Sequence, residues 1–155
     1  TLEGRRALLV EVQALTTTSP GNNPMRRTTG FENARAAMLI AVTERAARLK
    51  LWDKDVYLAT VAGAKISDPG ADLAMCLAIT SSARDKALPI DLVAIGEVAL
   101  SGDVRPVPGM NQRLSEAARI GFKTALVPKS TKLPPGVTGI RLIEVSSLGD
   151  AVNAV

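Results

Sequence analysis

The sequence predicts a layered domain of the α/β or α+β class, in which helices pack against sheets. Segments typical of strands and helices alternate along the 155 residues, and this alternation favours layered architectures. One tight turn, Ser101-Gly102-Asp103, joins two short strand-like runs and predicts a hairpin. Hydrophobic residues make up 46% of the chain but aromatic residues only 3%, so the core must be built from Ala, Val, Leu and Ile.

The first third of the chain predicts a strand, a long loop and a helix. Residues 7–15, ALLVEVQAL, are rich in Val and Leu and alternate in part, which is typical of a strand. Residues 16–29 contain two prolines, a glycine and two asparagines and predict an exposed loop. Residues 31–50 predict an amphipathic helix. Its apolar stripe consists of Ala34, Met38, Ala41, Val42 and Leu49.

The middle of the chain predicts a strand followed by a buried helix. Residues 54–62 form the strand, and residues 63–67 a turn or the start of a short strand. Asp68-Pro69 is a helix-start signal, because Asp can cap a helix and Pro suits its first position. The helix over about 70–83 is apolar on nearly every side and is therefore expected at the centre.

The last third of the chain predicts short strands and two helices. Gly121 is the stop signal of the first of these helices. The strands are expected at 91–100, 104–107, 125–127 and 140–145, the helices at 111–120 and 147–155, and a second loop at 129–139.

Residue totals exclude several classes of site. The chain has no histidine, which excludes Ser–His and Cys–His catalytic pairs and histidine metal sites. Cys76 is the one cysteine, so no internal disulfide can form, and a reducing compartment such as the cytoplasm is expected. A net charge of +4 and a pI of about 9.6 permit contact with nucleic acid without establishing it.

The length and hydropathy pattern predict a single domain over residues 1–155. No apolar run reaches the roughly 18 residues that a membrane span needs, so we expect no membrane contact. The N-terminus has no basic segment leading into an apolar one, so we expect no signal peptide in this stretch.

Two stretches resemble the proteolytic domain of Lon proteases. KISDPGADLAM, at 65–75, resembles the segment in which Lon carries its nucleophilic serine. The run from AIGEVALSGDVRPVPGMNQRL to ALVPK, at 94–129, resembles the Lon stretch that carries the catalytic lysine. The resemblance is good over about 56–128. It implies a Lon-like fold of mixed sheets packed with helices.

Further motifs resemble the RadA/Sms family, whose members end in a Lon-like domain. These motifs are Leu2-Glu3-Gly4, residues 9–15 (LVEVQAL), the Arg26-Arg27…Gly30-Phe31…Arg35 run, Asp68-Pro69…Ala71-Asp72 and Gly96-Glu97…Ser101-Gly102.

The resemblance implies that the Lon catalytic dyad is missing. Lon uses a serine nucleophile and a lysine of lowered pKa that takes the serine proton. Aligned without gaps, the serine position holds Ala71 and the lysine position holds Asn111. Because neither side chain can replace its counterpart, we expect no peptidase activity from this dyad.

Several residues offer other readings of the same region. Ser67 with Lys65, or Ser101 with a nearby lysine, could form a rearranged dyad, although both serines also suit turns. Cys76 lies inside an apolar helix, where an inert thiol is usual. Asn111 could cap its helix, and Asp72 could be a structural carboxylate near the dyad positions.

The RadA/Sms resemblance implies a role in DNA repair and recombination. It implies a non-catalytic scaffold that forms a hexameric ring under a DNA-dependent ATPase, which processes and branch-migrates recombination intermediates. The partners implied are further copies of the chain, single-stranded or branched DNA, and the recombinase RecA. We expect no cofactor here, because the chain lacks Gly-x-x-x-x-Gly-Lys-Ser/Thr and any Cys-x-x-Cys pair. ATP, Mg²⁺ and Zn²⁺ are implied for upstream domains.

Arg26, Arg27 and Arg35 are the candidate DNA-contact residues. Arginine neutralises phosphates without sequence preference, and the predicted loop would expose the first two. Lys123, Lys129 and Lys132 are weaker candidates because they are scattered and have no aromatic residues between them. Two alternatives remain open at this stage: a Lon-type Ser–Lys peptidase with a rearranged dyad, and a protein-docking module without DNA contact.

Overall fold

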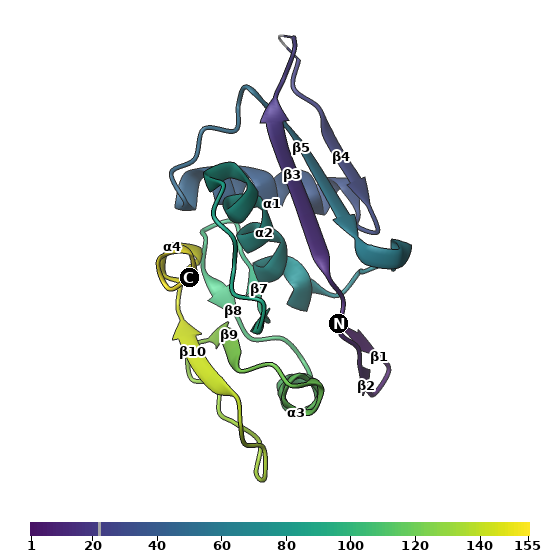
Figure 1. Cartoon of the computed structure of the whole chain (residues 1–155), viewed down its shortest axis with the longest axis vertical. Helices are drawn as coiled ribbons and strands as arrows, with labels where there is room; N and C mark the ends of the chain where they lie inside the picture. The colour runs from purple at the N-terminus through teal and green to yellow at the C-terminus, as the bar shows by residue number, and fades with distance from the viewer. Residues whose placement is uncertain (22) are drawn as a thin grey trace.

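A computed structural model describes residues 1–21 and 23–155 and contains, over those residues, two three-stranded sheets, two short hairpins and four α-helices (Figure 1). The prediction of a layered fold with mixed sheets is therefore confirmed. Residue 22, which belongs to the predicted loop at 16–29, lies outside the described residues.

The first sheet is built from strands β3 (Val12–Thr18), β4 (Arg26–Thr29) and β5 (Lys54–Thr60). β5 lies in the middle, with β3 antiparallel and β4 parallel to it. In Figure 1 helix α1 crosses behind this sheet, and helix α2 lies next to β3.

Two sequence predictions about this sheet are wrong. The strand predicted at 7–15 begins only at Val12, and the loop predicted at 16–29 contains the end of β3 and the whole of β4. β4 reads RRTT and has no apolar pattern. It is a strand because its backbone pairs with β5 over four residues, and tertiary pairing of this kind overrides composition.

Helix α1 (Asn33–Ala46) is shorter than the helix predicted at 31–50. The face that it buries also differs from the predicted apolar stripe. Ala34 and Ala41, expected on the apolar stripe, are exposed. The residues that α1 buries are Ala36, Leu39, Ile40, Val42 and Thr43.

Helix α2 (Asp72–Arg84) is the central helix, as predicted. It follows a single 3₁₀ turn, Pro69–Ala71, in which the Asp68 carboxylate accepts a hydrogen bond from the Gly70 amide. The predicted Asp-Pro start signal is therefore confirmed. Its apolar residues Leu73, Met75, Cys76, Leu77 and Ile79 are almost completely buried.

The second sheet consists of three parallel strands, β6 (Leu92–Ala94), β9 (Thr124–Pro128) and β10 (Arg141–Val145). The strand predicted at 91–100 is interrupted after β6. The Gly96 amide donates to the carbonyl of Gly70, so the chain leaves the sheet and approaches the start of α2.

After this break the chain forms the predicted hairpin. Its strands are β7 (Glu97–Val98) and β8 (Val104–Arg105), which pair antiparallel. A second hairpin, β1 (Leu2–Glu3) with β2 (Arg6–Ala7), opens the chain. In Figure 1 this N-terminal hairpin lies beside helix α3.

Helix α3 (Met110–Ile120) begins one residue earlier than predicted. Gly109, whose φ is +73°, stands at its N-cap, a backbone conformation that favours glycine. Asn111 is the second residue inside the helix, so the reading of Asn111 as a helix cap is wrong. Helix α4 (Leu148–Asn153) begins with a capping box between Ser147 and Asp150.

The main hydrophobic core joins α1, α2 and α4 to β7–β10. Two smaller clusters lie between α3 and the second sheet and between α1, α2 and β5. Among the described residues, no helix is both long and apolar enough to cross a membrane.

Candidate functional site

The two positions that the Lon resemblance assigns to the dyad lie in different surroundings. Ala71 is buried in the 3₁₀ turn that leads into α2, with only 9% of its surface exposed. Asn111 is exposed on the first turn of α3. Neither side chain carries a nucleophile or a titratable base, so these two residues provide no acyl-transfer chemistry.

An ion pair between Asp68 and Arg113 joins the 3₁₀ turn to helix α3. Nη2 of Arg113 lies 2.7 Å from Oδ2 of Asp68, and both side chains are largely buried. Nε of Arg113 also donates to the carbonyl of Pro108, at 3.1 Å. A Cβ atom on Gly70 would lie 2.7 Å from Nη1 of Arg113, so this guanidinium packs directly against the backbone next to Ala71.

The environment of Asp68 favours its charged form. Burial raises its pKa, but hydrogen bonds from the amides of Gly70 and Leu2 and the contact with Arg113 outweigh burial and hold the pKa below its usual value. The Leu2 amide lies 2.9 Å from Oδ2 of Asp68. Because of this bond the N-terminal hairpin is tied to the start of α2.

The side chain of Leu2 also closes the space above Gly109. A Cβ atom built on Gly109 would collide with Cδ1 of Leu2. The segment on which the Lon resemblance places the catalytic lysine is therefore covered by the N-terminal hairpin.

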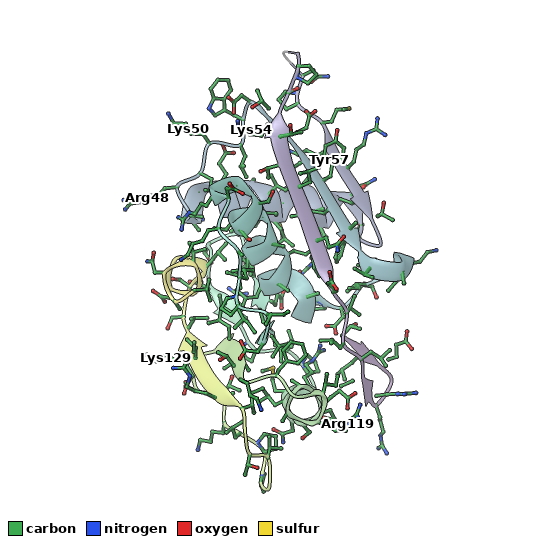
Figure 2. The ribbon with its side chains drawn as sticks, viewed as in Figure 1. Arg48, Lys50, Lys54, Tyr57, Arg119 and Lys129 are labelled. Carbon is green, nitrogen blue, oxygen red and sulfur yellow. The ribbon has the colours of Figure 1, made fainter. Side chains whose placement is uncertain are left out.

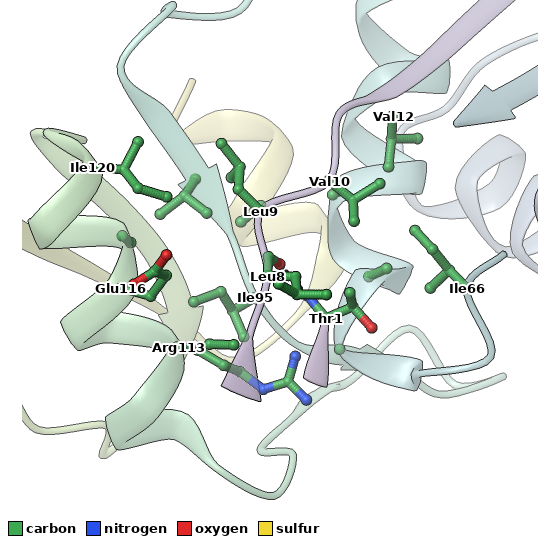
Figure 3. A pocket seen from close by; sticks show the side chains of 17 residues that line it. Thr1, Leu8, Leu9, Val10, Val12, Ile66, Ile95, Arg113, Glu116 and Ile120 are labelled. Atoms are coloured by element: carbon green, nitrogen blue, oxygen red, sulfur yellow. Dashed lines mark hydrogen bonds between the residues drawn. The ribbon is translucent and has the colours of Figure 1, made fainter. Parts of the chain in front are cut away.

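A small cavity remains between the N-terminal segment, α2 and α3 (Figure 3). Its volume is about 60 Å³, which has room for a few water molecules. The lining is mostly apolar, and its polar side chains are those of Thr1, Arg113 and Glu116. The lining contains Ala71 but no serine, lysine or cysteine.

Arg35 and Asp72 form a second ion pair across α1 and α2. Nε of Arg35 donates to Oδ1 of Asp72 at 2.7 Å, and Nη2 donates to Oδ2. Asp72 is fully buried and also accepts a hydrogen bond from the Val98 amide, while 30% of the Arg35 side chain is exposed. Burial raises the pKa of Asp72, and the hydrogen bond to Asp72 raises the pKa of Arg35. Asp72 therefore fixes the direction in which the guanidinium faces the surface.

Two surface hollows meet at Arg35. One, of about 530 Å³, contains Lys65 and Ser67; the other, of about 380 Å³, contains Glu97 and Arg105. The three cations Arg35, Lys65 and Arg105 therefore share one surface, which we call the Arg35 surface. Sequence reasoning missed Lys65 and Arg105 as part of this group, because 30 and 70 residues separate them from Arg35 and no local pattern links them.

Arg26 and Arg27 lie in strand β4 rather than in a loop. The Arg26 guanidinium donates to the carbonyls of Leu51, at 2.7 Å, and Lys54. Arg27 is exposed and is paired in register with Tyr57 of β5. The three arginines therefore have different surroundings. Arg26 donates hydrogen bonds to backbone carbonyls, Arg35 pairs with Asp72, and Arg27 is exposed to solvent.

The candidate substitute nucleophiles lack the surroundings of an activated group. Oγ of Ser101 donates to Oδ2 of Asp103, at 2.7 Å. Ser67 and Lys65 are both exposed, whereas a lysine that acts as a general base is usually buried. Burial raises the pKa of the Cys76 thiol to about 12, so it is protonated and inert.

Neither a cluster of metal-ligating side chains nor a phosphate-binding loop motif is found among the described residues. Among them, no three His, Cys, Asp or Glu side chains gather closely enough to hold a metal ion. The sequence carries no phosphate-binding Gly-x-x-x-x-Gly-Lys-Ser/Thr loop.

Comparison with known proteins gives one family. Residues 15–144 match the family described as "Lon protease (S16) C-terminal proteolytic domain". The chain is 45% identical over 159 residues to the DNA repair protein RadA of Mycolicibacterium smegmatis, a match that covers all of this chain and 33% of the relative. It is 50% identical over 142 residues to RadA of Mycobacterium tuberculosis, covering 91% of this chain and 30% of the relative. It is 45% identical over 151 residues to RadA of Escherichia coli, a match that covers 97% of this chain and 33% of the relative. The chain thus spans about a third of the length of these relatives.

Proposed function

Because the chain belongs to the family of Lon protease C-terminal proteolytic domains, in the form found in RadA proteins, we propose that it is a non-catalytic domain of a DNA repair protein. In this role it holds copies of the protein in a hexameric ring and offers DNA a basic surface. The whole protein is proposed to be a DNA-dependent ATPase that acts on recombination intermediates, with ATP, Mg²⁺ and Zn²⁺ bound outside this chain and RecA among its partners.

One observation carries the non-catalytic part of the proposal: Arg113 packs beside Ala71, and Leu2 covers the turn that leads to Asn111. The guanidinium packs against Gly70 beside Ala71, and Leu2 packs against Gly109 two residues before Asn111. A peptidase needs an open groove that leads to its nucleophile, whereas here the remaining cavity measures about 60 Å³. A rearranged Ser67–Lys65 dyad is the rival, and its two side chains share a hollow with Arg35.

The Arg35 surface supports the DNA-contact part of the proposal. Lys65 and Arg105 are exposed on either side of Arg35, and each exposed cation can neutralise a phosphate. Arg27 adds a further exposed cation on β4. Arg26 has a supporting role in this account, since backbone carbonyls already accept hydrogen bonds from its guanidinium.

Exposed apolar side chains support the assembly part of the proposal. Ile90 is 98% exposed and Leu9 47% exposed, and both line a hollow of about 460 Å³ together with Phe122. A gathering of large apolar residues on a surface is typical of a protein interface. The occupant proposed here is a neighbouring copy of the chain. The rival is a different protein docked at the same place, without DNA contact.

The experiment for DNA contact compares the intact protein with a Lys65→Gln/Arg105→Gln variant. Binding to a single-stranded oligonucleotide is measured against salt concentration by fluorescence anisotropy. The logarithm of the binding constant falls linearly with the logarithm of the salt concentration, and each lost phosphate contact should reduce the magnitude of this slope by about 0.7. The double variant removes two contacts, so its slope should be smaller in magnitude by about 1.4. Arg35 is left unchanged because its removal would leave the buried Asp72 unpaired. Lys86→Gln/Arg141→Gln, which removes one exposed lysine and one exposed arginine elsewhere, is the matched control. Equal slopes for all three proteins would contradict DNA contact at the Arg35 surface.

A further inference from the structure

Trp52 is the one tryptophan in the chain, and 70% of its surface is exposed. It lies in the loop between α1 and β5, which reads Arg48-Leu49-Lys50-Leu51-Trp52-Asp53-Lys54 at 48–54. An indole of this size normally buries most of its surface, because exposing it to water is unfavourable. Neither the hydrophobic core nor the Arg35 surface accounts for a tryptophan in this position.

The structure holds the Trp52 loop in a defined conformation. Oε1 of Glu44 accepts hydrogen bonds from the amides of Leu51, at 2.7 Å, and Trp52, at 3.1 Å. The Leu51 side chain is 1% exposed and anchors the loop in the core between α1 and β5. Arg26 donates to the Leu51 carbonyl from the neighbouring strand. The loop therefore presents Trp52 from a fixed backbone.

Basic side chains surround this loop. Arg48 and Lys50 are exposed, and Nζ of Lys54 reaches Oγ1 of Thr18, at 2.9 Å. In Figure 2 these three residues lie at one end of the molecule, around the end of α1 and the start of β5, whereas Arg119 and Lys129 lie in the other half.

The acidic side chains next to the loop are partly or fully buried. Glu44 is engaged by the two loop amides, and Asp55 is buried and accepts a hydrogen bond from the Met25 amide. One carboxylate oxygen of Asp53 is buried as well. The charge that this end of the molecule shows to solvent is therefore predominantly positive.

We propose that Trp52, with Arg48, Lys50 and Lys54, is a stacking site for single-stranded nucleic acid. An exposed aromatic ring among cations is the combination that binds single strands, because a base stacks on the ring while cations neutralise the flanking phosphates. Duplex DNA keeps its bases stacked inside the helix and cannot use the indole in this way. The inference deepens the proposed DNA contact, on which it rests, by adding a second site at the opposite end of α1.

A titration of this chain with an oligothymidylate of about 15 nucleotides tests the inference directly. Since Trp52 is the single tryptophan, emission excited at the long-wavelength edge of the indole band, where Tyr57 does not absorb, reports on this residue alone. A stacked base should quench the emission, saturably and in step with the anisotropy of a labelled oligonucleotide. Emission that stays constant while the anisotropy saturates would overturn the proposal. A duplex of the same length should quench the emission much less.

Substitutions at Trp52 separate stacking from other contacts. Trp52→Phe should keep most of the affinity, whereas Trp52→Leu and Trp52→Ala should each weaken single-strand binding about tenfold. Because the side chain is mostly exposed, these variants should unfold at the same denaturant concentration as the parent. Leu133→Ala, at another exposed apolar position, is the matched control and should leave single-strand binding unchanged. Unchanged affinity in Trp52→Ala would overturn the proposal and assign the indole to a protein partner.

The same assays distinguish the two proposals. If Lys65→Gln/Arg105→Gln weakens binding and Trp52→Ala does not, the stacking site is wrong while the Arg35 surface stands. If neither variant weakens binding, both proposals fail. If both variants weaken binding, and Trp52→Phe keeps the affinity that Trp52→Ala loses, both proposals are supported.

Discussion

The Arg113 guanidinium and the Asp68 carboxylate form an ion pair of 2.7 Å beside Ala71, the residue that the Lon resemblance assigns to the serine position. The exposed fractions of the two side chains are 6% and 12%. Because the pair is buried, it ties the start of α2 to α3.

Breaking this pair should destabilise the fold strongly. Arg113→Leu leaves Asp68 buried without its cation, and the expected cost is about 3 kcal/mol in the free energy of unfolding. Arg119→Leu, on the same helix, removes an exposed partner of Glu116 and should leave the urea midpoint nearly unchanged. Equal midpoints for the two variants would show that the buried pair contributes no more than the exposed one.

The same pair should make stability sensitive to acid. The folded-state pKa of Asp68 lies below its unfolded value of about 3.9, so its contribution is complete above that value. The contribution is lost as the pH falls through the lower folded-state pKa. Asp72 acts in the opposite direction: its raised pKa gives a contribution that is present at low pH and lost as the pH rises.

Urea unfolding of the parent and Asp68→Asn, from about pH 5 down to about pH 2, checks this prediction. The difference in unfolding free energy between the two proteins should shrink as the pH falls. Glu3→Gln, at an exposed position in the N-terminal hairpin, is the matched control for the loss of one carboxylate. A difference that grows with acidification would contradict the assignment of a lowered pKa to Asp68.

The fold could be predicted from local signals, but the site could not. The Asp68-Pro69 start, the apolar run of α2 and the stop at Gly121 are encoded within a few residues, and the structure confirms them. The Arg35–Asp72 pair joins residues 37 positions apart. Helical periodicity predicts that Arg35 lies on the polar side of α1, but it does not reveal Asp72 as the partner of Arg35.

Long-range pairing also explains why β4 and Arg26 were mispredicted. The sequence RRTT after two prolines favours a loop, yet β5 supplies the backbone partners that make it a strand. Once β4 pairs with β5, Arg26 is next to the carbonyls of Leu51 and Lys54. Local composition cannot reveal that the Arg26 guanidinium donates hydrogen bonds to carbonyl oxygens of another segment.

Cys76 should be unreactive in the folded chain. With its pKa raised to about 12, its thiolate fraction is roughly a thousandfold smaller than that of an ordinary thiol. A chromogenic disulfide reagent at about pH 8 should therefore label the native protein only at the rate of unfolding. Urea above the unfolding midpoint should make labelling fast. Rapid labelling without urea would contradict the buried position.

Ile90→Asp should weaken assembly without affecting the fold. The side chain is 98% exposed, so a charge there costs the single chain little, but it would be buried and unpaired between copies. Light scattering during gel filtration should show the mass falling toward that of one chain. Leu133→Asp, at another exposed apolar residue, is the control. An unchanged mass for Ile90→Asp would remove this surface from the proposed ring contact.

The most direct test of the non-catalytic assignment is a peptidase assay on the intact protein. Casein turnover and covalent labelling by a serine-reactive phosphonate are measured beside an active serine peptidase. We predict neither turnover nor label, because the residues that the Lon resemblance assigns to the dyad, Ala71 and Asn111, lack a nucleophile and a base, and Arg113 packs beside Ala71. Turnover or labelling that disappears in Ser67→Ala would contradict the account and establish a rearranged Ser–Lys enzyme.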